Sequence, residues 1–405
     1  MSQPESIPSL CMACDSSACD FKAVMLARRN VGPYDVEIDM KYCGVCHSDL
    51  HVAAGHMQGV TGKVKYPCVP GHELAGVAVR VGEKVTKIKV GDQVGVGCMV
   101  DSCGSCSSCK AGQEQKCSKQ VATYQGKDLN GRAAVWPPKS RTLGGYSKNH
   151  VIHENFAVKI PSGYSLSAAG PVMCAGITMY DPMLQHGIKA GDSVGIVGLG
   201  GLGVMGVKLA KALGCKVSVI SRSKAKEALA IKVGADKLVA SSDPEDMASN
   251  LGSLDLIINT VPIYHDYSVY TPLLSKTSRI GKQVLLGLHE GIASGFALTA
   301  VTFGRSRIAA SGIGGIAATQ AVIDLCAKNK IYPEVEVVGC EKLNKVYQQL
   351  NDSNDEGKRY VLDLGTLKEG VVCEDPPPVL DPVKGMSPRS ILATVMRDLF
   401  TARWW

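Results

Sequence analysis

The sequence predicts an α/β protein that joins a mostly-β domain to a doubly wound parallel sheet. Short alternating β segments broken by glycine, such as LAGVAVRVG and DQVGVGCMV, run from residue 22 to about 170. From about 175 to 312 strands and helices alternate, as in SVGIVG, GLGVMGVKLAKALG and KVSVIS, which indicates a parallel sheet. A helical segment, TQAVIDLCAKNKI, and the β-like YVLDL follow. We therefore expect the chain to return to its first domain.

Composition excludes several classes of protein. The chain has 405 residues, enough for two or three domains with their own cores. No window approaches the roughly 18 apolar residues of a membrane span. The net charge of +7 comes from scattered Lys and Arg and does not indicate a nucleic-acid partner. The N-terminus has no apolar signal core and no Arg-rich stretch, so we expect a cytoplasmic protein. Its sixteen cysteines then favour metal ligands or reactive thiols over disulfides.

The strongest motif is a group of four cysteines at C-x2-C-x2-C-x7-C spacing. It consists of Cys103, Cys106, Cys109 and Cys117. Short spacers turn successive thiolates toward one centre, and four of them close a tetrahedral shell. We therefore expect a structural zinc site. The alternative is a set of unligated thiols or local disulfides.

A second metal site is predicted from three separate segments. Cys46 lies in YCGVCHSDLH, His72 in PGHELAG and Cys174 in PVMCAGITMY. Two thiolates and one imidazole would leave the fourth position of a zinc ion open, as in catalytic sites. Taken alone each residue has an ordinary interpretation, since a buried cysteine is most often a small core residue.

A glycine-rich turn predicts a dinucleotide site. VGLGGLG follows a predicted strand and opens a helix, so its backbone amides can hold a pyrophosphate. An NAD enzyme usually carries an acid at the end of the next strand, whereas this chain has Ser221, Arg222 and Ser223, followed by Lys226. Hydroxyls and cations there favour a 2′-phosphate and hence NADP, although a solvated basic helix start is the alternative. The residues of the turn are Gly198, Leu199, Gly200, Gly201, Leu202 and Gly203.

With these segments assembled, residues 22 to about 366 resemble the zinc-containing medium-chain alcohol dehydrogenases, in particular the cinnamyl alcohol dehydrogenase-like, NADP-dependent branch. CGVCHSDLH, PGHE, the four-cysteine lobe, CAGITMY and GLGGLG occur in family order. The resemblance implies reversible hydride transfer between a primary alcohol and its aldehyde. It also implies two Zn²⁺ ions per chain, NADP(H) and a homodimer, with no nucleic-acid or membrane partner.

The resemblance also implies a GroES-like catalytic domain that is interrupted by a Rossmann domain. We expect the catalytic domain over residues 1–174, with the structural-zinc lobe at 98–120, and again over 313–366. The NADP-binding domain is expected over 175–312. The final section, 367–405, is expected to be a proline-rich linker and an amphipathic helix from about Ser387 that either docks on an apolar surface or frays.

Metal-site roles follow from the same resemblance. It makes Cys46, His72 and Cys174 resemble the catalytic-zinc ligands. Glu73 would be an alternative fourth ligand when substrate is absent. Asp49 resembles the carboxylate that orients the histidine ligand.

The proton path and the cofactor contacts are implied in the same way. Ser48 would take the proton of the alcohol and pass it through the cofactor ribose to His51 and solvent. The further cofactor contacts that the resemblance implies are His47, Ser48, Thr178, Thr260, Gly287, Ser311, Gly312, Ile313 and Arg359.

Two positions depart from the cinnamyl branch. Ala122 and Gly312 stand where those enzymes tend to place aromatic walls, which weakens the case for a phenylpropanoid substrate. Oxidation of a polyol or a short-chain alcohol by the same machinery is one alternative. A partner-binding protein on an inherited dehydrogenase scaffold is another, and a missing catalytic ligand would favour it. No ligand is missing.

Overall fold

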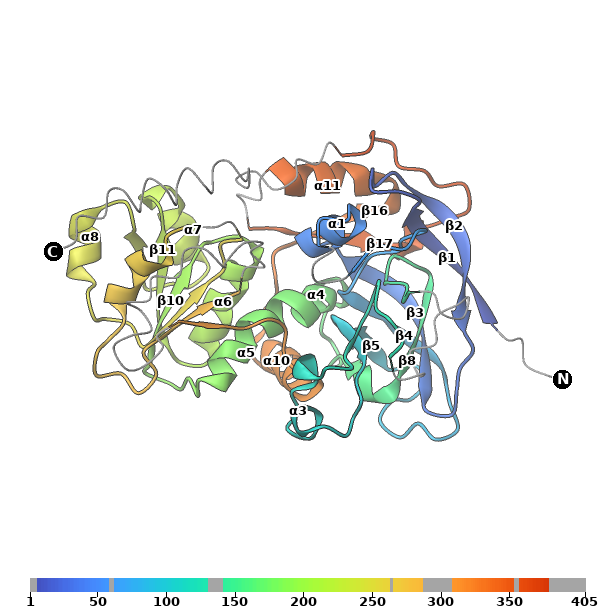
Figure 1. Ribbon diagram of the computed structural model, residues 1–405, viewed down its shortest axis with the longest axis horizontal. Coiled ribbons are helices and arrows are strands. Elements are labelled where there is room, and N and C mark those ends of the chain that lie inside the picture. The colour runs from blue at the N-terminus through green and yellow to red at the C-terminus, as the bar shows by residue number, and fades with distance from the viewer. Residues whose placement is uncertain are drawn as a thin grey trace. The chain divides into compact units, whose positions relative to one another are not determined.

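A computed structural model describes residues 6–57, 62–129, 141–262, 265–286, 308–352 and 357–378. These residues divide into two compact units (Figure 1). The first contains the chain up to Asp181, Gly200–Met205 and the residues from Gly312 on, and the second contains Pro182–Leu199 and Gly206–Ser311. Gly287 and the expected C-terminal helix lie outside the described residues.

The first unit is built around a seven-stranded sheet. Its strand order is β16-β17-β3-β4-β5-β9, and β8 also pairs with β3. The strand β17 runs parallel to β16 and antiparallel to β3, so the last strand along the chain joins the sheet between two others. The strands are β3 (Asp35–Gly44), β4 (Leu74–Val81), β5 (Gln93–Val96), β8 (Asn149–His153), β9 (Val158–Lys159), β16 (Val335–Gly339) and β17 (Arg359–Asp363).

A hairpin precedes this sheet in the chain. Strand β1 (Ser6–Cys14) pairs antiparallel with β2 (Phe21–Arg29) in continuous register. The sequence predicts no element before residue 22, because SIPSLCMAC contains a proline and does not alternate polar with apolar residues. Its C-terminal half is nevertheless fully buried and belongs to the main core.

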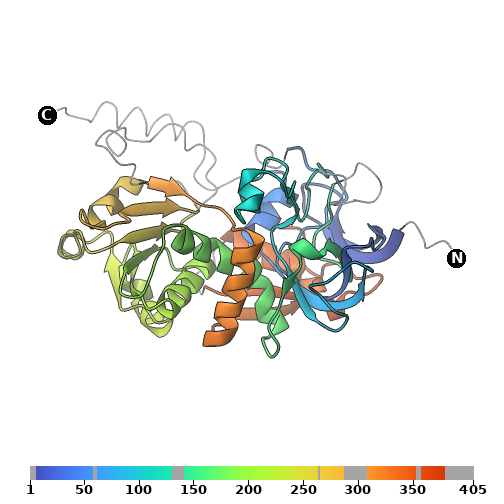
Figure 2. The ribbon, with the colours of Figure 1, turned by 90° about the horizontal axis from the view of Figure 1, so that it is seen from below.

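Helices of the first unit carry several of the expected site residues. Helix α1 follows β3 directly, and α4 continues through a π-helical turn, η3, into α5. The helix α10 packs against η3, as the orange and green segments in Figure 2 show. These helices are α1 (His47–Ala53), α3 (Ser107–Lys110), α4 (Leu166–Pro171), η3 (Val172–Gly176), α5 (Ile177–Gln185), α10 (Ile316–Asn329) and α11 (Leu343–Asp352). The end of α5, from Pro182 on, is assigned to the second unit.

Short elements complete the first unit. The strands β6 (Met99–Asp101) and β7 (Val121–Ala122) pair on either side of the four-cysteine segment. Single 3₁₀ turns are η1 (Glu114–Lys116), η2 (Glu154–Phe156), η7 (Cys340–Lys342) and η8 (Leu364–Thr366).

The second unit contains a six-stranded sheet in which every pair is parallel. Its order is β12-β11-β10-β13-β14-β15, so the strand order reverses beside the first strand, as in dinucleotide-binding folds. This confirms the predicted fold class. The elements are β10 (Ser193–Val197), α6 (Gly201–Ala212), β11 (Lys216–Ser221), η4 (Lys224–Lys226), α7 (Glu227–Lys232), β12 (Lys237–Ala240), α8 (Pro244–Ser249), β13 (Leu256–Asn259), η5 (Tyr267–Leu273), β14 (Lys282–Leu285) and β15 (Ile308–Ala310). The start of α6, up to Met205, is assigned to the first unit.

None of the helices in the described parts of the chain is long and apolar enough to cross a membrane.

Candidate active site and metal centres

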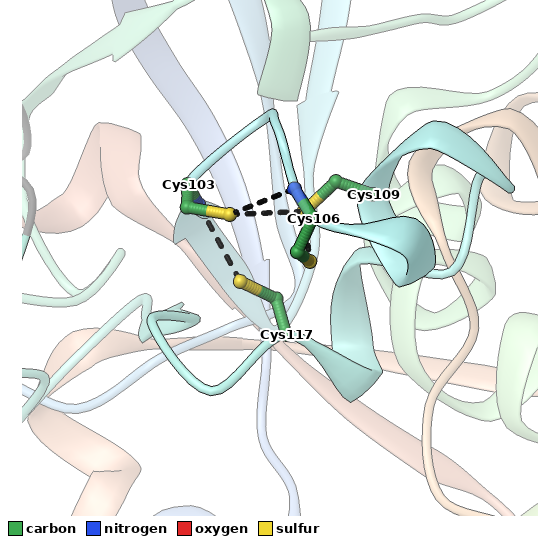
Figure 3. Close-up of side chains that lie close together, drawn as sticks. All are labelled: Cys103, Cys106, Cys109 and Cys117. Atoms are coloured by element: carbon green, nitrogen blue, oxygen red, sulfur yellow. Dashed lines mark hydrogen bonds between the residues drawn. The ribbon is translucent and has the colours of Figure 1, made fainter.

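The four-cysteine lobe brings its thiols together. The Sγ atoms of Cys103, Cys106, Cys109 and Cys117 all lie within 4.8 Å of one another, and Figure 3 shows them converging on one point. The Cys103 sulfur accepts hydrogen bonds from the backbone amides of Ser105 (3.5 Å) and Cys106 (3.3 Å). These amides lower the pKa of Cys103 to about 5, so the lobe favours the thiolate form that a metal ion needs.

The residues of the Cys–His–Cys site come from three separate segments of the chain. Cys46 is the N-cap of α1, His72 precedes β4, and Cys174 lies in the π-helical turn η3. Their donor atoms, with that of Glu73, lie within 4.8 Å of one another, and all four residues are buried. The His72 Nε2 is 3.2 Å from the Cys174 Sγ. A π-turn at this point agrees with the frequent use of such turns at functional sites.

Glu73 has an unusual environment within this site. Its side chain is fully buried, and its Oε1 lies 2.6 Å from the Nη2 of Arg359. Its Oε2 has no hydrogen-bond partner in the described part of the chain. Burial raises the pKa of Glu73 to about 7, although the nearby guanidinium opposes the shift. The carboxyl group can therefore be neutral or ionised near neutral pH.

Asp49 organises the histidine ligand. Its Oδ1 accepts from the His72 Nδ1 (2.8 Å) and from the Gly71 amide (3.1 Å). Its Oδ2 accepts from the Cys46 amide (3.0 Å) and from the Tyr146 hydroxyl (3.1 Å). Because Nδ1 donates to a carboxylate, Nε2 is the nitrogen with a lone pair available for a metal.

The donor chemistry of both groups fits zinc. Four cysteines suit a closed structural site, whereas two cysteines and one histidine suit a site with an open position. Hydrogen bonding from the Cys174 thiol lowers the pKa of Cys46 well below its usual range. One carboxylate oxygen of Glu73 lies within 4.8 Å of the other donor atoms, so it could also contact an ion at the second group. The chain therefore has two sites that suit zinc.

The two expected proton carriers lie on α1, one helical turn apart. The Ser48 Oγ is 3.1 Å from the Cys46 Sγ. The His51 Nδ1 is 3.2 Å from the Nδ1 of His56. Burial lowers the pKa of His51 to about 4, and the neighbouring His47 and His56 add to the effect. On the same helix, the His47 Nε2 donates a hydrogen bond to the Leu350 carbonyl oxygen (2.6 Å).

The second unit places the expected cofactor residues at the carboxyl ends of its strands. Gly198 follows β10 with a φ of +88°, and a Cβ there would lie 2.8 Å from the Thr260 Oγ1. The Thr260 hydroxyl donates to the Val197 carbonyl oxygen (2.8 Å). Leu199 next to this turn is buried, and the Ser311 amide donates to the Leu285 carbonyl oxygen (3.1 Å).

The segment after β11 is open and basic. Its first residue, Ser221, ends the strand, and the Ser223 hydroxyl caps the turn η4, in which Lys226 lies. Arg222 is exposed, and no described residue forms a hydrogen bond or ion pair with its guanidinium. Its carbonyl oxygen is held by the Ser242 amide (3.2 Å) and hydroxyl (2.5 Å). The backbone is thus fixed while the cation stays available.

The remaining expected cofactor residues belong to the first unit. No atom lies within 4 Å of a Cβ built on Gly200 or Gly312, so both backbones are open to a ligand. Thr178 is buried near the start of α5, and Ile313 packs against the main core. The others in this unit are Gly201, Leu202 and Gly203 in the first turn of α6, and Arg359 at the start of β17.

Two tyrosines at the site carried no sequence signal. Tyr124 stacks on His72, with ring centroids 5.7 Å apart and an interplanar angle of 26°. Tyr146 donates to Asp49 from a loop almost a hundred positions away. Neither belongs to a ligand motif, and contacts between distant loops have no period along the chain.

Comparison with known proteins decides the family. Residues 32–162 match the alcohol dehydrogenase GroES-like domain, and residues 201–328 match the zinc-binding dehydrogenase family. The chain is 42% identical over 347 residues to the NADP-dependent alcohol dehydrogenase C 1 of Mycolicibacterium smegmatis, covering 85% of this chain and 94% of that protein. The chain belongs to the zinc-containing medium-chain alcohol dehydrogenases.

Further similarities place this alcohol dehydrogenase in the cinnamyl alcohol dehydrogenase-like branch. It is 42% identical to cinnamyl alcohol dehydrogenase 8 of Arabidopsis thaliana, covering 84% of this chain and 91% of that protein. The structure of a Helicobacter pylori enzyme of this type, complexed with NADP(H), superposes with a TM-score of 0.78 at 35% identity, covering 90% of this chain and all of that one. The protein is thus a zinc-type oxidoreductase that acts on CH–OH groups, as the sequence predicted.

Proposed function

We propose that this dehydrogenase interconverts a primary alcohol and its aldehyde at the Cys46–His72–Cys174 site. The observation that carries the proposal is the convergence of two buried thiols and a buried imidazole fixed by Asp49, with the partly buried hydroxyl of Ser48 next to one thiol. A zinc ion bound there supplies Lewis-acid chemistry that lowers the pKa of an alcohol.

The protein's own side chains supply the remaining functions. The Ser48 hydroxyl, 3.1 Å from a ligand sulfur, is placed to take the proton of the alcohol. His51 is the next proton carrier on the same helix face. In its neutral form it can accept a proton at one ring nitrogen, while the other faces His56 at 3.2 Å.

We further propose a specific cofactor and domain arrangement. The catalytic domain comprises residues 1–174 and 313–366, and residues 175–312 bind NADP(H). Support comes from the parallel sheet, the open glycine turn and the exposed side chain of Arg222. Gly198–Gly203 would hold the pyrophosphate, and Ser221–Ser223 with Lys226 the 2′-phosphate.

We also propose a cellular location and an oligomeric state for the enzyme. None of the sixteen cysteines forms a disulfide, which suits the reducing environment of the cytoplasm. We infer a homodimer from the family expectation, and light scattering of the purified protein tests it.

The decisive experiment measures turnover and zinc together. A panel of aromatic, short-chain and polyol alcohols and their aldehydes is assayed with both nicotinamide cofactors, and zinc is counted per chain. The variant Cys46→Ser should retain fold and one zinc but lose turnover. Cys215→Ser, which removes a buried cysteine in the second unit, is the matched control and should keep both zinc ions. Turnover by Cys46→Ser at the wild-type rate would refute the site assignment.

A further inference from the structure

A chain of two buried phenol groups lies behind the Cys–His–Cys site. The Tyr146 hydroxyl donates to the Asp49 Oδ2 (3.1 Å), and the Tyr347 hydroxyl donates to the Tyr146 oxygen (3.4 Å). Both side chains are fully buried. A buried hydroxyl costs free energy unless it is hydrogen-bonded, and phenylalanine would fill nearly the same volume without that cost. The hydroxyl groups therefore call for an explanation beyond packing.

Asp49 connects the hydrogen-bonded pair of tyrosines to the metal site. One carboxylate accepts four hydrogen bonds, two on each oxygen. Three of the donors are groups of the ligand segments themselves, namely the Cys46 amide, the Gly71 amide and the His72 ring. Tyr146 is the fourth, and it is the only one of these four donors that comes from outside those segments. Burial raises the pKa of Tyr146 well above its usual range, with the Asp49 charge adding to the shift, so the phenol remains a donor.

Tyr146 also contacts the backbone that leads to His72, through its main chain and its ring. The Tyr146 amide donates to the Pro70 carbonyl oxygen (3.1 Å), and the Gly145 amide donates to that of Gly71 (2.9 Å). Gly71 has a φ of +103°, and a Cβ there would lie 2.7 Å from the Tyr146 Cδ1. The main chain and ring of Tyr146 thus contact the segment before His72, while its hydroxyl reaches the same ligand through Asp49.

Tyr347 is the member of the tyrosine pair that lies farther from the metal site. It lies on α11, in the segment that returns to the first unit, and its ring packs edge-on against Phe21 with centroids 5.3 Å apart. Phe21 begins β2 of the N-terminal hairpin. Segments from both ends of the described chain therefore fix the position of the Tyr146 hydroxyl.

We propose that Tyr146 is a positioning residue of the catalytic metal site. Its hydroxyl fixes the rotation of the Asp49 carboxylate and so orients the His72 ring, and Tyr347 fixes that hydroxyl. The inference rests on the proposed role of His72 as a zinc ligand. Partners that orient ligands in this way typically change metal affinity or activity by about 10- to 100-fold when they are removed.

The test measures metal affinity in the full-length protein. Zinc binding by Tyr146→Phe is compared with that of the wild type by competition with a chelator, and Co²⁺ replaces zinc so that its visible absorption reports ligand geometry. We expect about tenfold weaker binding at the Cys–His–Cys site and a changed cobalt spectrum. The four-cysteine site should be unaffected and serves as an internal reference. Tyr347→Phe should shift the affinity in the same direction by less.

The chain offers a matched control. Tyr164 is another buried tyrosine of the first unit, and its hydroxyl donates to the Ile331 carbonyl oxygen (2.7 Å), away from the site. Tyr164→Phe should lower thermal stability without changing zinc affinity or the cobalt spectrum. The inference is overturned if Tyr146→Phe binds zinc as the wild type does, or if Tyr164→Phe weakens binding equally. If Tyr146→Phe does not fold, an unchanged affinity in Tyr347→Phe overturns it. A wild type without zinc at this site would instead refute the proposed function.

Discussion

At the scale of single residues, burial and hydrogen-bond partners determine what two of the histidines can do. His51 and His150 are both desolvated, and burial lowers the pKa of each. His51 still has a ring nitrogen 3.2 Å from His56, which offers a way out for a proton. The two ring nitrogens of His150 have no hydrogen-bond partner among the described residues, so it offers none. One histidine therefore suits proton transfer, whereas the other affects only stability.

The proton role of His51 predicts a pH-dependent defect. His51→Gln should slow alcohol oxidation most at low pH, because glutamine cannot accept a proton and solvent base is scarce there. Zinc content should stay at the wild-type value. His186→Gln, in the segment after α5, is the control for loss of an imidazole. Rates that match the wild type from about pH 6 to 9 would remove His51 from the mechanism.

His150 predicts a pH-dependent stability. Burial lowers its pKa well below the usual range, and the Arg28 and Arg29 charges add to the shift. The unfolded chain takes up this proton near pH 6.5, whereas the folded chain does so only at lower pH. The contribution of neutral His150 to the free energy of unfolding is therefore fully present above about pH 6.5. It is lost as pH falls toward the folded-state pKa, by at most about 1.4 kcal/mol per pH unit.

The measurement is the melting temperature across this pH range. His150→Leu should give a shallower decline on the acid side than the wild type. His153→Gln, at the end of the same strand and not buried, controls for removal of an imidazole. Parallel pH profiles for His150→Leu and the wild type would show that the buried ring does not set the slope.

At the scale of elements, the four-cysteine lobe has almost no core of its own. Helix α3 has four residues, none of them buried, and the 3₁₀ turn η1 has none either. The lobe is tied to the start of α10 by the Ile316 amide, which donates to the Glu114 Oε2 (3.1 Å). Its order therefore depends on the ion that its four thiolates can hold.

Loss of that ion predicts a stability defect. Cys106→Ser should contain one zinc per chain and melt at a lower temperature, because a structural zinc contributes directly to folding. Turnover per folded molecule should survive, in contrast to Cys46→Ser. Metal analysis that finds one zinc or none per wild-type chain would contradict the prediction.

Elements differ in how far the sequence could predict them. The parallel strands and the glycine-rich turn follow from local patterns, and the four-cysteine group follows from residue type and spacing. The second metal group lies in three distant segments, and the family resemblance was needed to assign its ligands. The strand β1 was missed because its register depends on pairing with β2. The π-helical turn at Cys174 was missed because five residues are too few to show a period. The contact between Asp49 and Tyr146 joins distant loops, which leave no mark in local sequence.

At the scale of the whole molecule, cofactor choice depends on where the parallel sheet ends. Arg222 follows β11, the strand next to β10, at the carboxyl edge of the sheet where dinucleotides bind. Its backbone is fixed by Ser242 while its side chain is exposed. This arrangement can distinguish a ribose that carries a phosphate from one that does not.

The prediction is a preference for NADPH expressed in KM. One phosphate-binding cluster supplies about 2–3 kcal/mol, or a factor on the order of one hundred. Arg222→Asp should shift the preference toward NADH. Lys232→Asp, an exposed position on α7 with the same change of charge, is the control and should leave the preference intact. Equal kcat/KM for the two cofactors in the wild type would count decisively against the assignment.

The place of β17 in the sheet has a consequence for synthesis on the ribosome. This strand (Arg359–Asp363) lies between β16 and β3, although β3 is made more than three hundred residues earlier. The strands of the inserted unit are all translated before β17. That unit can therefore complete its sheet first, since domains fold as units while the chain emerges. The Tyr42–Gly44 end of β3 meanwhile lacks this partner and presents unpaired backbone groups. The sheet of the first unit is thus the last to be completed. Until β17 is made, the exposed edge of β3 is the part of the nascent chain that most needs protection from aggregation.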